Sequence, residues 1–406
     1  MNITHWLSTK SKQPRMLQLD LLRGVAILLV LFTHSVVRPQ EAGSMGPVLG
    51  YLQRLGPTGV DLFFVLSGFL VGGLLFRELL TTGRLDVRRF LIRRAFRIWP
   101  SYFVFLAGVF IWLLLFEHRS AADSVRALWP NLLHVQNYFG SPRAHTWSLA
   151  VEEHFYLALP LGLWLLTTRL QSRLPALPGI AAGLFVLCAV LRLQAFTSRP
   201  PYDPYVATHL RMDSLFLGVL LAYYHHFNPA LLLLGGRFRL GLLCLGTALL
   251  LVFPAFAALG RGRLALSTLS PVFFYLCYGA FLLVAIQTPA GSGWLGRGWQ
   301  GLPARGLAFV GYYSYPIYLW HIDATRPVLR LLDRVALGSL PPELRWLCAF
   351  ATYVLVAVAS GVVFGLLLEK PSLALRDRLF PARTRPAPGH EKGRLHPATV
   401  TSPDST

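Results

Sequence analysis

The sequence predicts an all-α polytopic membrane protein with about ten transmembrane helices. Its 406 residues are 54% hydrophobic and only 14% charged, and their mean hydropathy is +0.52. Because soluble domains carry about 25% charged residues, a water-soluble enzyme, a disordered chain and a collagen-like fibre are excluded. Apolar segments of nearly bilayer-spanning length recur along the chain, which indicates a protein whose solvent is mainly lipid.

The apolar segments define the expected spans and three regions. A hydrocarbon layer of about 30 Å requires about 20 apolar residues in a helix. On this criterion the spans lie near residues 20–37, 58–76, 98–116, 147–167, 178–194, 211–225, 240–258, 268–287, 306–322 and 346–368. The regions are a cytoplasmic N-terminal segment 1–18, a transmembrane domain 19–370 and a cytoplasmic tail 371–406. The tail is expected to be largely disordered, because it is rich in proline and polar residues beyond about residue 380.

The distribution of Lys and Arg predicts the orientation. These residues accumulate in the cytoplasmic loops of membrane proteins. Here they are concentrated in the segment 77–97 and in the C-terminal tail. Both termini are therefore predicted to lie in the cytoplasm, with the chain crossing the cell (inner or plasma) membrane several times.

The net charge and the cysteines exclude further classes of partner. The formal charge of +20 comes from 38 Lys and Arg against 18 Asp and Glu. Basic loops explain such an excess without nucleic acid, which is not expected as a partner, and anionic headgroups or a polyanionic small molecule fit better. The four cysteines fall in or beside apolar runs without metal-ligand spacing, so no metal site is predicted.

Ionisable residues near the outer ends of the expected spans form a first candidate site. Such groups are costly at membrane depth and usually functional. Arg23 at the inner end and His34 near the outer end of the first span share one helix face, because about three helical turns separate them. The predicted topology brings further polar residues to the outer third of the membrane, where His34 lies, namely Asp61, Glu152, Glu153, Arg211, Asp213 and His321. A carboxylate beside an imidazole orients the ring and supports its protonated form, as a general base requires.

A basic segment on the expected cytoplasmic side, RRFLIRRAFR, forms a second candidate site. If it is helical, Arg94 and Arg97 are i,i+3 neighbours, and Arg93 and Arg97 are i,i+4 neighbours. Guanidinium groups bind phosphates bidentately. Glu369 ends the last span at the same inner surface. A base near the outer surface and a phosphate site near the inner surface predict a substrate that reaches across the bilayer.

Each feature also has an ordinary structural explanation. His34 suits an interfacial or hydrogen-bonded helix histidine, and Arg23 suits a side chain that extends to the inner headgroups. The basic segment suits a topogenic signal, while Glu152 and Glu153 suit the start of a helix, where carboxylates interact favourably with the dipole. The joint placement of these residues favours the functional interpretation.

A series of motifs occurs in the order found in a known family. They are R-x10-H at Arg23 and His34, FFVLSGFL, RRAFR, SLAVEEHFY, RMDSLFLG, YSYPIYLWH and EKP. Over about residues 16–380 the sequence resembles the acyltransferase-3 family of integral membrane O-acyltransferases. The resemblance implies ten spans that carry an acyl group, usually acetyl, from cytoplasmic coenzyme A to an acceptor. Acceptors in that family are typically sugar hydroxyls of lipopolysaccharide, exopolysaccharide or peptidoglycan, and in some members antibiotics.

The resemblance also implies roles for single residues. His34 matches the catalytic histidine of the family and Arg23 its partner on the first helix. Arg94 and Arg97 match an R-x-x-R motif that is implicated in donor binding. The glutamates of the S-L-x-V-E and E-K/R-P motifs correspond to Glu152 and Glu369.

The sequence departs from one large subgroup of the family because it has no C-terminal SGNH hydrolase-like domain. The departure leaves open a separate periplasmic or extracellular partner for any second transfer step.

The predicted function is acyl transfer from cytoplasmic acyl-CoA, in the first place acetyl-CoA, to a hydroxyl of a cell-envelope glycan or glycolipid. Acyl-CoA is a donor substrate, and no permanently bound cofactor is expected. The predicted catalytic residues are His34, Arg23, Glu152 and Asp61, with Glu152 or Asp61 orienting the imidazole. The predicted donor-binding residues are Arg93, Arg94, Arg97 and Arg23. The predicted acceptor-binding residues are Glu153, His321, Arg211, Asp213 and Ser148.

The mechanism requires His34 to face one continuous tunnel that is open to the donor on one side and to the acceptor on the other. The imidazole then either removes the hydroxyl proton or accepts the acyl group transiently. A transporter or flippase of an anionic lipid-linked substrate is the alternative, because intramembrane charges and basic loops suit it too. The acyl chain, the acceptor and the oligomeric state stay open.

Overall fold

The fold is entirely helical in the part of the chain that the structure describes. The computed structural model describes residues 16–169, 173–198, 200–258, 263–288, 291, 293–334 and 339–381, and no strand occurs among them. The longer helices are α2 (Leu17–Thr33), α4 (Gly59–Thr82), α5 (Val87–Leu115), α8 (Trp147–Trp164), α9 (Leu177–Ser198), α10 (Met212–Phe227), α11 (Gly236–Ala258), α12 (Arg263–Ile286) and α17 (Pro342–Phe364). The shorter ones are α3 (Gly46–Gln53), α6 (Ala121–Leu132), α7 (Gln136–Phe139), α13 (Gly293–Gly298), α14 (Leu302–Tyr312), α15 (Ser314–Trp320), α16 (Thr325–Arg334) and α18 (Lys370–Leu379).

The predicted apolar segments coincide with helices. Each overlaps one helix, except that the segment near 306–322 is divided at Tyr313 into α14 and α15. Five helical stretches of the described residues are long and apolar enough to cross a membrane, namely Gly43–Thr82, Val87–Leu115, Ala144–Arg169, Leu174–Ser198 and Pro342–Leu379. The chain is therefore a membrane protein by helix length and composition, while the number of ten spans and the side of each terminus stay predictions.

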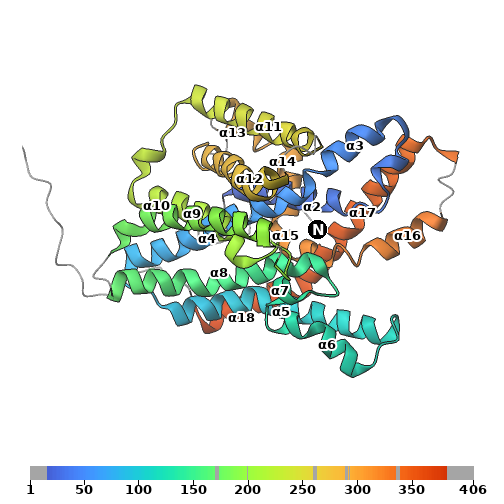
Figure 1. The fold of residues 1–406 in the computed structure, drawn as a ribbon, viewed down its shortest axis with the longest axis horizontal. Helices are drawn as coiled ribbons and strands as arrows, with labels where there is room; N and C mark the ends of the chain where they lie inside the picture. Colours follow the sequence, from blue (N-terminus) through green and yellow to red (C-terminus); the bar gives the residue numbers. More distant parts are fainter. Residues whose placement is uncertain are drawn as a thin grey trace, which may run out of the picture.

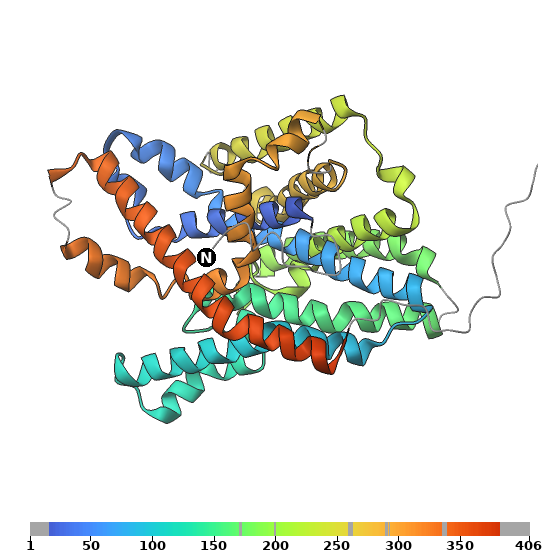
Figure 2. The ribbon, with the colours of Figure 1, turned by 180° about the vertical axis from the view of Figure 1, so that it is seen from behind.

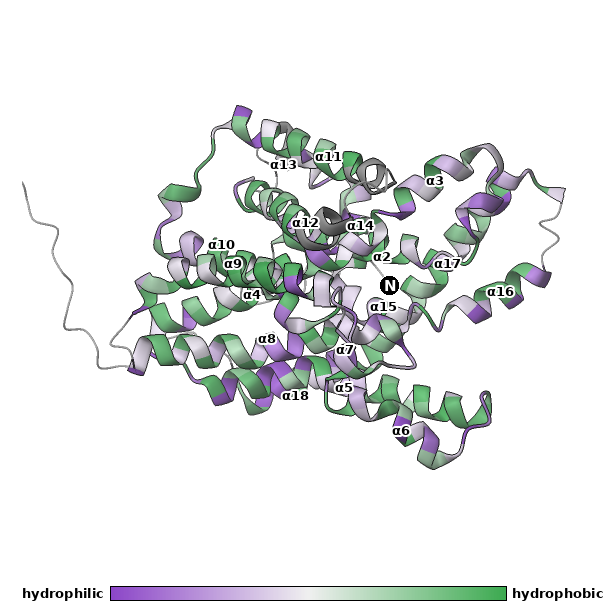
Figure 3. Ribbon diagram, viewed as in Figure 1, coloured by the Kyte–Doolittle hydropathy of each residue, from purple (hydrophilic) through white to green (hydrophobic). Residues whose placement is uncertain are grey.

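The outward faces of the long helices are apolar, as a lipid solvent requires. Leu115 of α5, Val186 of α9 and Leu355 of α17 are exposed by 61%, 64% and 70%. Figure 3 shows hydrophobic residues along most of the long helices. Contiguous exposed apolar surface of this kind is rare on soluble monomers, so these faces mark the part that contacts the bilayer.

The C-terminal end of the last long helix continues beyond the predicted domain boundary at 370. A π-helical turn, Gly365–Glu369, joins α17 to α18, which packs against α5. The predicted tail thus begins with an ordered helix over Lys370–Leu379, and residues 382–406 lie outside the described residues. Ser372 Oγ donates a hydrogen bond to the carbonyl oxygen of Phe96 at 2.5 Å.

Helix α2, which carries Arg23 and His34, lies at the centre of the bundle (Figures 1 and 2). It packs against α4, α12, α14 and α15. Its crossing with α14 is very close: a Cβ atom on Gly311 would lie 1.7 Å from the carbonyl oxygen of Asp20, and one on Gly24 would lie 2.2 Å from that of Leu307. Small residues allow two helix backbones to approach in this way in membranes.

This close crossing leads to a first prediction. Replacing Gly311 by leucine should lower the free energy of unfolding by about 1–3 kcal/mol or more. The new side chain would overlap the backbone of α2, which cannot move aside. The shift is measurable as a lower Tm of the detergent-solubilised protein. Gly306→Leu on the same helix is the matched control, since a Cβ there meets no heavy atom within 4 Å. Equal effects of the two variants would contradict the close crossing.

Candidate functional site

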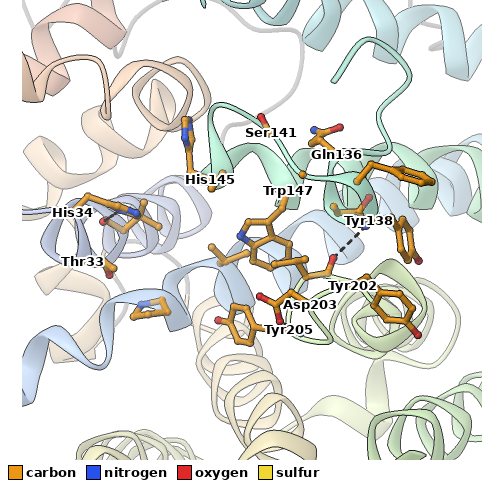
Figure 4. Close-up of a pocket in the computed structure, with 18 of the residues that line it drawn as sticks. Thr33, His34, Gln136, Tyr138, Ser141, His145, Trp147, Tyr202, Asp203 and Tyr205 are labelled. Carbon is orange, nitrogen blue, oxygen red and sulfur yellow. Dashed lines mark hydrogen bonds between the residues drawn. The ribbon is translucent and has the colours of Figure 1, made fainter. Parts of the chain in front are cut away.

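His34 ends α2 and lines a cavity of about 610 Å³. Its half-buried ring opens into this cavity, which Figure 4 shows. The cavity is bounded by the end of α2, by the segment 136–147 and by the segment 201–206. Its volume lies within the range of about 300–1,000 Å³ that is typical of small-molecule sites, and we call it the His34 cavity.

The backbone fixes which nitrogen of His34 can act as a base. Nδ1 of His34 lies 3.0 Å from the carbonyl oxygen of Val30. A carbonyl oxygen only accepts hydrogen bonds, so the neutral ring carries its proton on Nδ1 and its lone pair on Nε2. The side chain is thus held in the tautomer that can take a proton from a substrate hydroxyl through Nε2.

Two further histidine rings lie next to His34. The His34 and His321 rings are 5.0 Å apart between centroids, and His321 and His145 are also 5.0 Å apart. His321 is fully buried and donates from Nδ1 to the carbonyl oxygen of Tyr318 at 2.6 Å, and His145 donates from Nε2 to that of Leu319 at 3.2 Å. Within the described ranges no group of His, Cys, Asp and Glu could hold a metal ion.

A second, smaller cavity of about 110 Å³ holds the predicted donor residues. Arg23 of α2, Arg94 and Arg97 of α5, and Ser148 and Glu152 of α8 all line it. The tertiary structure thus brings together residues from three helices, and we call this space the arginine cavity. Arg23 also forms an ion pair with Asp20 at 3.1 Å. Guanidinium groups that converge on one cavity suit phosphate groups, which they bind bidentately.

Inside the arginine cavity the charges are arranged around Arg94. Its guanidinium carbon lies 4.0 Å from the centre of the Tyr156 ring, and its buried Nε has no hydrogen-bond partner among the described residues. Glu152 interacts electrostatically with both Arg94 and Arg23. A buried guanidinium nitrogen without a partner costs free energy until it donates a hydrogen bond.

Glu369 belongs to the same charged region, whereas Arg93 points elsewhere. Glu369 interacts electrostatically with Arg97 and Arg23. Arg93 forms an ion pair with Asp377 of α18 at 3.2 Å and donates to the carbonyl oxygen of Phe380. The sequence groups Arg93 with the donor site because it is an i,i+4 neighbour of Arg97, but the structure directs it to α18.

The two cavities meet at Val60 and Tyr318, which line both of them. The Tyr318 hydroxyl donates to the carbonyl oxygen of His145 at 2.6 Å, so the bond of 2.7 Å between Tyr318 and Ser148 must be donated by the serine. These two bonds hold the phenol ring between the cavities. The two cavities therefore adjoin at this ring, and the single continuous tunnel expected from the sequence stays a prediction.

Asp61, Arg211 and Asp213 form buried ion pairs instead of facing the cavities. Arg211 binds Asp61 at 2.7 Å, and Arg192 binds Asp213 at 2.7 Å. All four side chains are at most 3% exposed. Since the carboxylate of Asp61 is engaged by Arg211, the contacts that orient His34 are the Val30 carbonyl and the His321 ring, and we do not assign that role to Asp61.

Glu153, the next residue of α8, contacts α5 through Trp99. The indole nitrogen of Trp99 donates to Glu153 Oε2 at 3.4 Å, while the buried Oε1 lacks a hydrogen-bond partner in the described part of the chain. Glu153 lines neither cavity.

Several residues of the site were not predicted from the sequence. His145, Trp147, Tyr205 and Tyr318 line the His34 cavity, but only their neighbours Ser148 and His321 are singled out by motif. His145 is an ionisable residue at the start of an expected span, which is a signal that sequence reasoning can use. Aromatic rings give no such signal, because most of them in an apolar helix serve as core.

Tyr205 stands outside the spans and keeps its proton. Partial removal of the phenol from water raises its pKa to about 12, against the opposing effect of the Arg211 guanidinium. The ring is therefore neutral at physiological pH.

Comparison with known proteins identifies the domain. Residues 16–366 match the acyltransferase-3 family model, which is described as an acyltransferase domain. The peptidoglycan O-acetyltransferase OatA of Listeria monocytogenes is 28% identical over 338 residues, which are 77% of this chain and 50% of that protein. YrhL of Bacillus subtilis is 29% identical over 330 residues, 75% of this chain and 47% of that protein.

The chain spans about half the length of the curated relatives that it matches. No solved structure matches it. The family model covers most of the chain, including every residue of both cavities. The chain therefore belongs to the acyltransferase-3 family and carries its acyltransferase domain.

Proposed function

We propose that the protein transfers an acyl group, in the first place acetyl, from acyl-CoA to a hydroxyl of a cell-envelope glycan or glycolipid. The observation that carries this proposal is the pair of cavities that meet at Val60 and Tyr318. One holds three arginines that suit the phosphates of coenzyme A, and the other holds an imidazole with its lone pair on Nε2. The O-acetyltransferase OatA, which resembles this chain, supports the same chemistry.

Each residue then has a defined part in the reaction. The donor phosphates bind Arg94, Arg97 and Arg23, and the pantetheine arm extends toward Tyr318. His34 Nε2 takes the proton of the acceptor hydroxyl, whose oxygen attacks the thioester carbon. The carbon–sulfur bond breaks, and the departing thiolate takes a proton to give the free thiol. In the covalent variant, Nε2 attacks first and the hydroxyl then displaces the imidazole.

Isotope transfer tests the function directly. Membranes that contain the protein are incubated with acetyl-labelled acetyl-CoA, and the glycan fraction is analysed by mass spectrometry. We expect covalent label on a glycan hydroxyl, lost in a deletion strain and restored by the gene. A transporter or flippase would leave every acceptor unlabelled, which would contradict the proposal.

The donor site leads to a second prediction. Replacing Arg97 by glutamate should raise the donor KM about tenfold or more, because hydrogen bonds to charged groups contribute about 1.5–3 kcal/mol each. The acceptor KM should change much less. Arg88→Glu is the matched control, since this substitution makes the same change of charge at an exposed position of α5. Equal increases of the donor KM in both variants would indicate that the basic segment only determines membrane topology.

A further inference from the structure

Two aromatic rings of the His34 cavity are braced from behind by a buried cation. The guanidinium carbon of Arg211 lies 4.8 Å from the centre of the Tyr205 ring and 5.7 Å from that of Trp147. A third ring, that of Phe64, completes the cage at 5.7 Å. A guanidinium within about 6 Å of a ring centre attracts the ring, so Arg211 holds Tyr205 and Trp147 in place.

The cation itself cannot move toward the cavity. Arg211 is 1% exposed, and its Nη2 binds the carboxylate of Asp61 at 2.7 Å. Its Nε and Nη1 lack hydrogen-bond partners within the described residues. The sequence assigns Arg211 to the acceptor, but its place behind the rings makes it a support for them.

The rings, in contrast, face the cavity. Tyr205 is 39% exposed and Trp147 is half-buried, and the two lie edge to face at 5.6 Å and 61°. Figure 4 shows Trp147 in the middle of the cavity, between His34 and His145 on one side and Tyr138 on the other, with Tyr205 and Asp203 nearby. Asp203 is exposed, and its Oδ1 accepts a hydrogen bond from the backbone nitrogen of Tyr205 at 2.9 Å.

The two aromatic rings and Asp203 together suit a ligand that has both an apolar face and a polar edge. Aromatic faces bind flat apolar surfaces, and a few polar groups fix the orientation of the ligand in such a cavity. A pyranose ring has an apolar face of C–H groups and an edge of hydroxyls. Because the two rings meet at 61°, a pyranose can stack on the face of one ring and contact the other, with hydroxyls toward Asp203 and His34.

We propose that Trp147 and Tyr205 form a stacking platform for a sugar ring of the acceptor, and that Arg211 is a positioning residue which acts through these two rings. Asp203 accepts a hydrogen bond from a sugar hydroxyl beside the platform. This inference rests on the proposed acyl transfer and adds the residues that recognise the acceptor.

The test compares one acceptor that has a ring face with one that has none. The probes are methyl N-acetylglucosaminide, which has a pyranose ring, and N-acetylglucosaminitol, the open-chain alditol of the same amino sugar. With labelled acetyl-CoA and the purified full chain, we expect wild-type protein to prefer the pyranoside. Tyr205→Ala and Trp147→Ala should each raise the KM for the pyranoside roughly tenfold, leave the donor KM unchanged and reduce the preference over the alditol.

Conservative variants separate a role in recognition from a role in folding. Tyr205→Phe keeps the ring, so its pyranoside KM should stay within about threefold of wild type. Arg211→Lys keeps the charge opposite Asp61 but loses the planar guanidinium, and it should raise the pyranoside KM with little change in kcat. Phe238→Ala, which removes an aromatic ring that is 75% exposed on α11, is the control and should change neither KM.

The outcomes distinguish this inference from the proposed function. If wild-type protein acylates the pyranoside but Tyr205→Ala and Trp147→Ala keep the wild-type KM and the wild-type preference, the platform is refuted while acyl transfer stands. If wild-type protein transfers label to neither probe and to no envelope glycan, both proposals fail. Loss of donor binding in the two alanine variants would also overturn the platform, since it would assign the rings to the donor.

Discussion

Replacing His34 by alanine should lower the rate of acyl transfer by about 10²–10⁴-fold, the usual contribution of a general base. The reason is geometric: the bond from His34 Nδ1 to the Val30 carbonyl leaves Nε2 as the proton acceptor in the cavity. The rate is measured as label transferred from acetyl-CoA to the envelope glycan. Donor KM should change little, because His34 does not line the arginine cavity.

The chain offers a matched control for this substitution. His226 donates from Nδ1 to the carbonyl oxygen of Ala222 at 2.9 Å, which is the same i to i−4 bond that His34 makes, but it lines neither cavity. His226→Ala should therefore retain activity within about twofold, since it removes the same backbone bond without the base. Near-normal transfer by the His34→Ala protein, inserted at normal levels, would refute the mechanism.

Breaking the buried pair between Arg211 and Asp61 should have the largest effect on stability. Removing one partner of such a pair costs about 3–5 kcal/mol, because the other charge stays buried and uncompensated. Asp61→Ala and Arg211→Ala should each lower the Tm strongly and reduce the amount of folded protein. The double variant should lose less than the sum of the two, because it leaves neither charge alone.

An exposed pair provides the comparison. Arg126 and Asp123 lie 3.9 Å apart with side chains that are 83% and 59% exposed. Exposed pairs contribute about 0–1 kcal/mol, so Arg126→Ala should leave the Tm almost unchanged. Strictly additive effects of Asp61→Ala and Arg211→Ala, measured by thermal unfolding in detergent, would show that the two side chains are not coupled in the folded protein.

Much of the helical framework follows from the sequence. Apolar segments of about 20 residues predict helices, and each predicted segment overlaps one. The break of the ninth segment at Tyr313 was not predicted, although Pro316 is a signal for it, because proline cannot donate the i to i−4 hydrogen bond of a continuous helix. The start of the tail was also beyond prediction, because the polar sequence of α18 is ordered by its contacts with α5.

The sequence predicted which residues line the two cavities better than it predicted which side chains pair with one another. Helical periodicity places Arg23 and His34 on α2, and Arg94 and Arg97 on α5, where the structure has them. Periodicity also groups Arg93 with Arg94, although Arg93 forms an ion pair with α18 and Arg94 lines the arginine cavity. The choice of partner depends on neighbouring helices, which a periodic pattern along one helix does not specify.

By itself, the sequence determined which residues lie in helices and which chemistry they can supply, and it predicted which of them stand at membrane depth. Hydropathy and the helical repeat are local properties of the chain, so they can be recognised without knowledge of the tertiary structure. Only the tertiary structure decided that Arg211 binds Asp61, 150 residues away, and that Tyr318 lines both cavities. A buried charge or ring takes the partner that helix packing places beside it, and that packing is a property of the whole bundle.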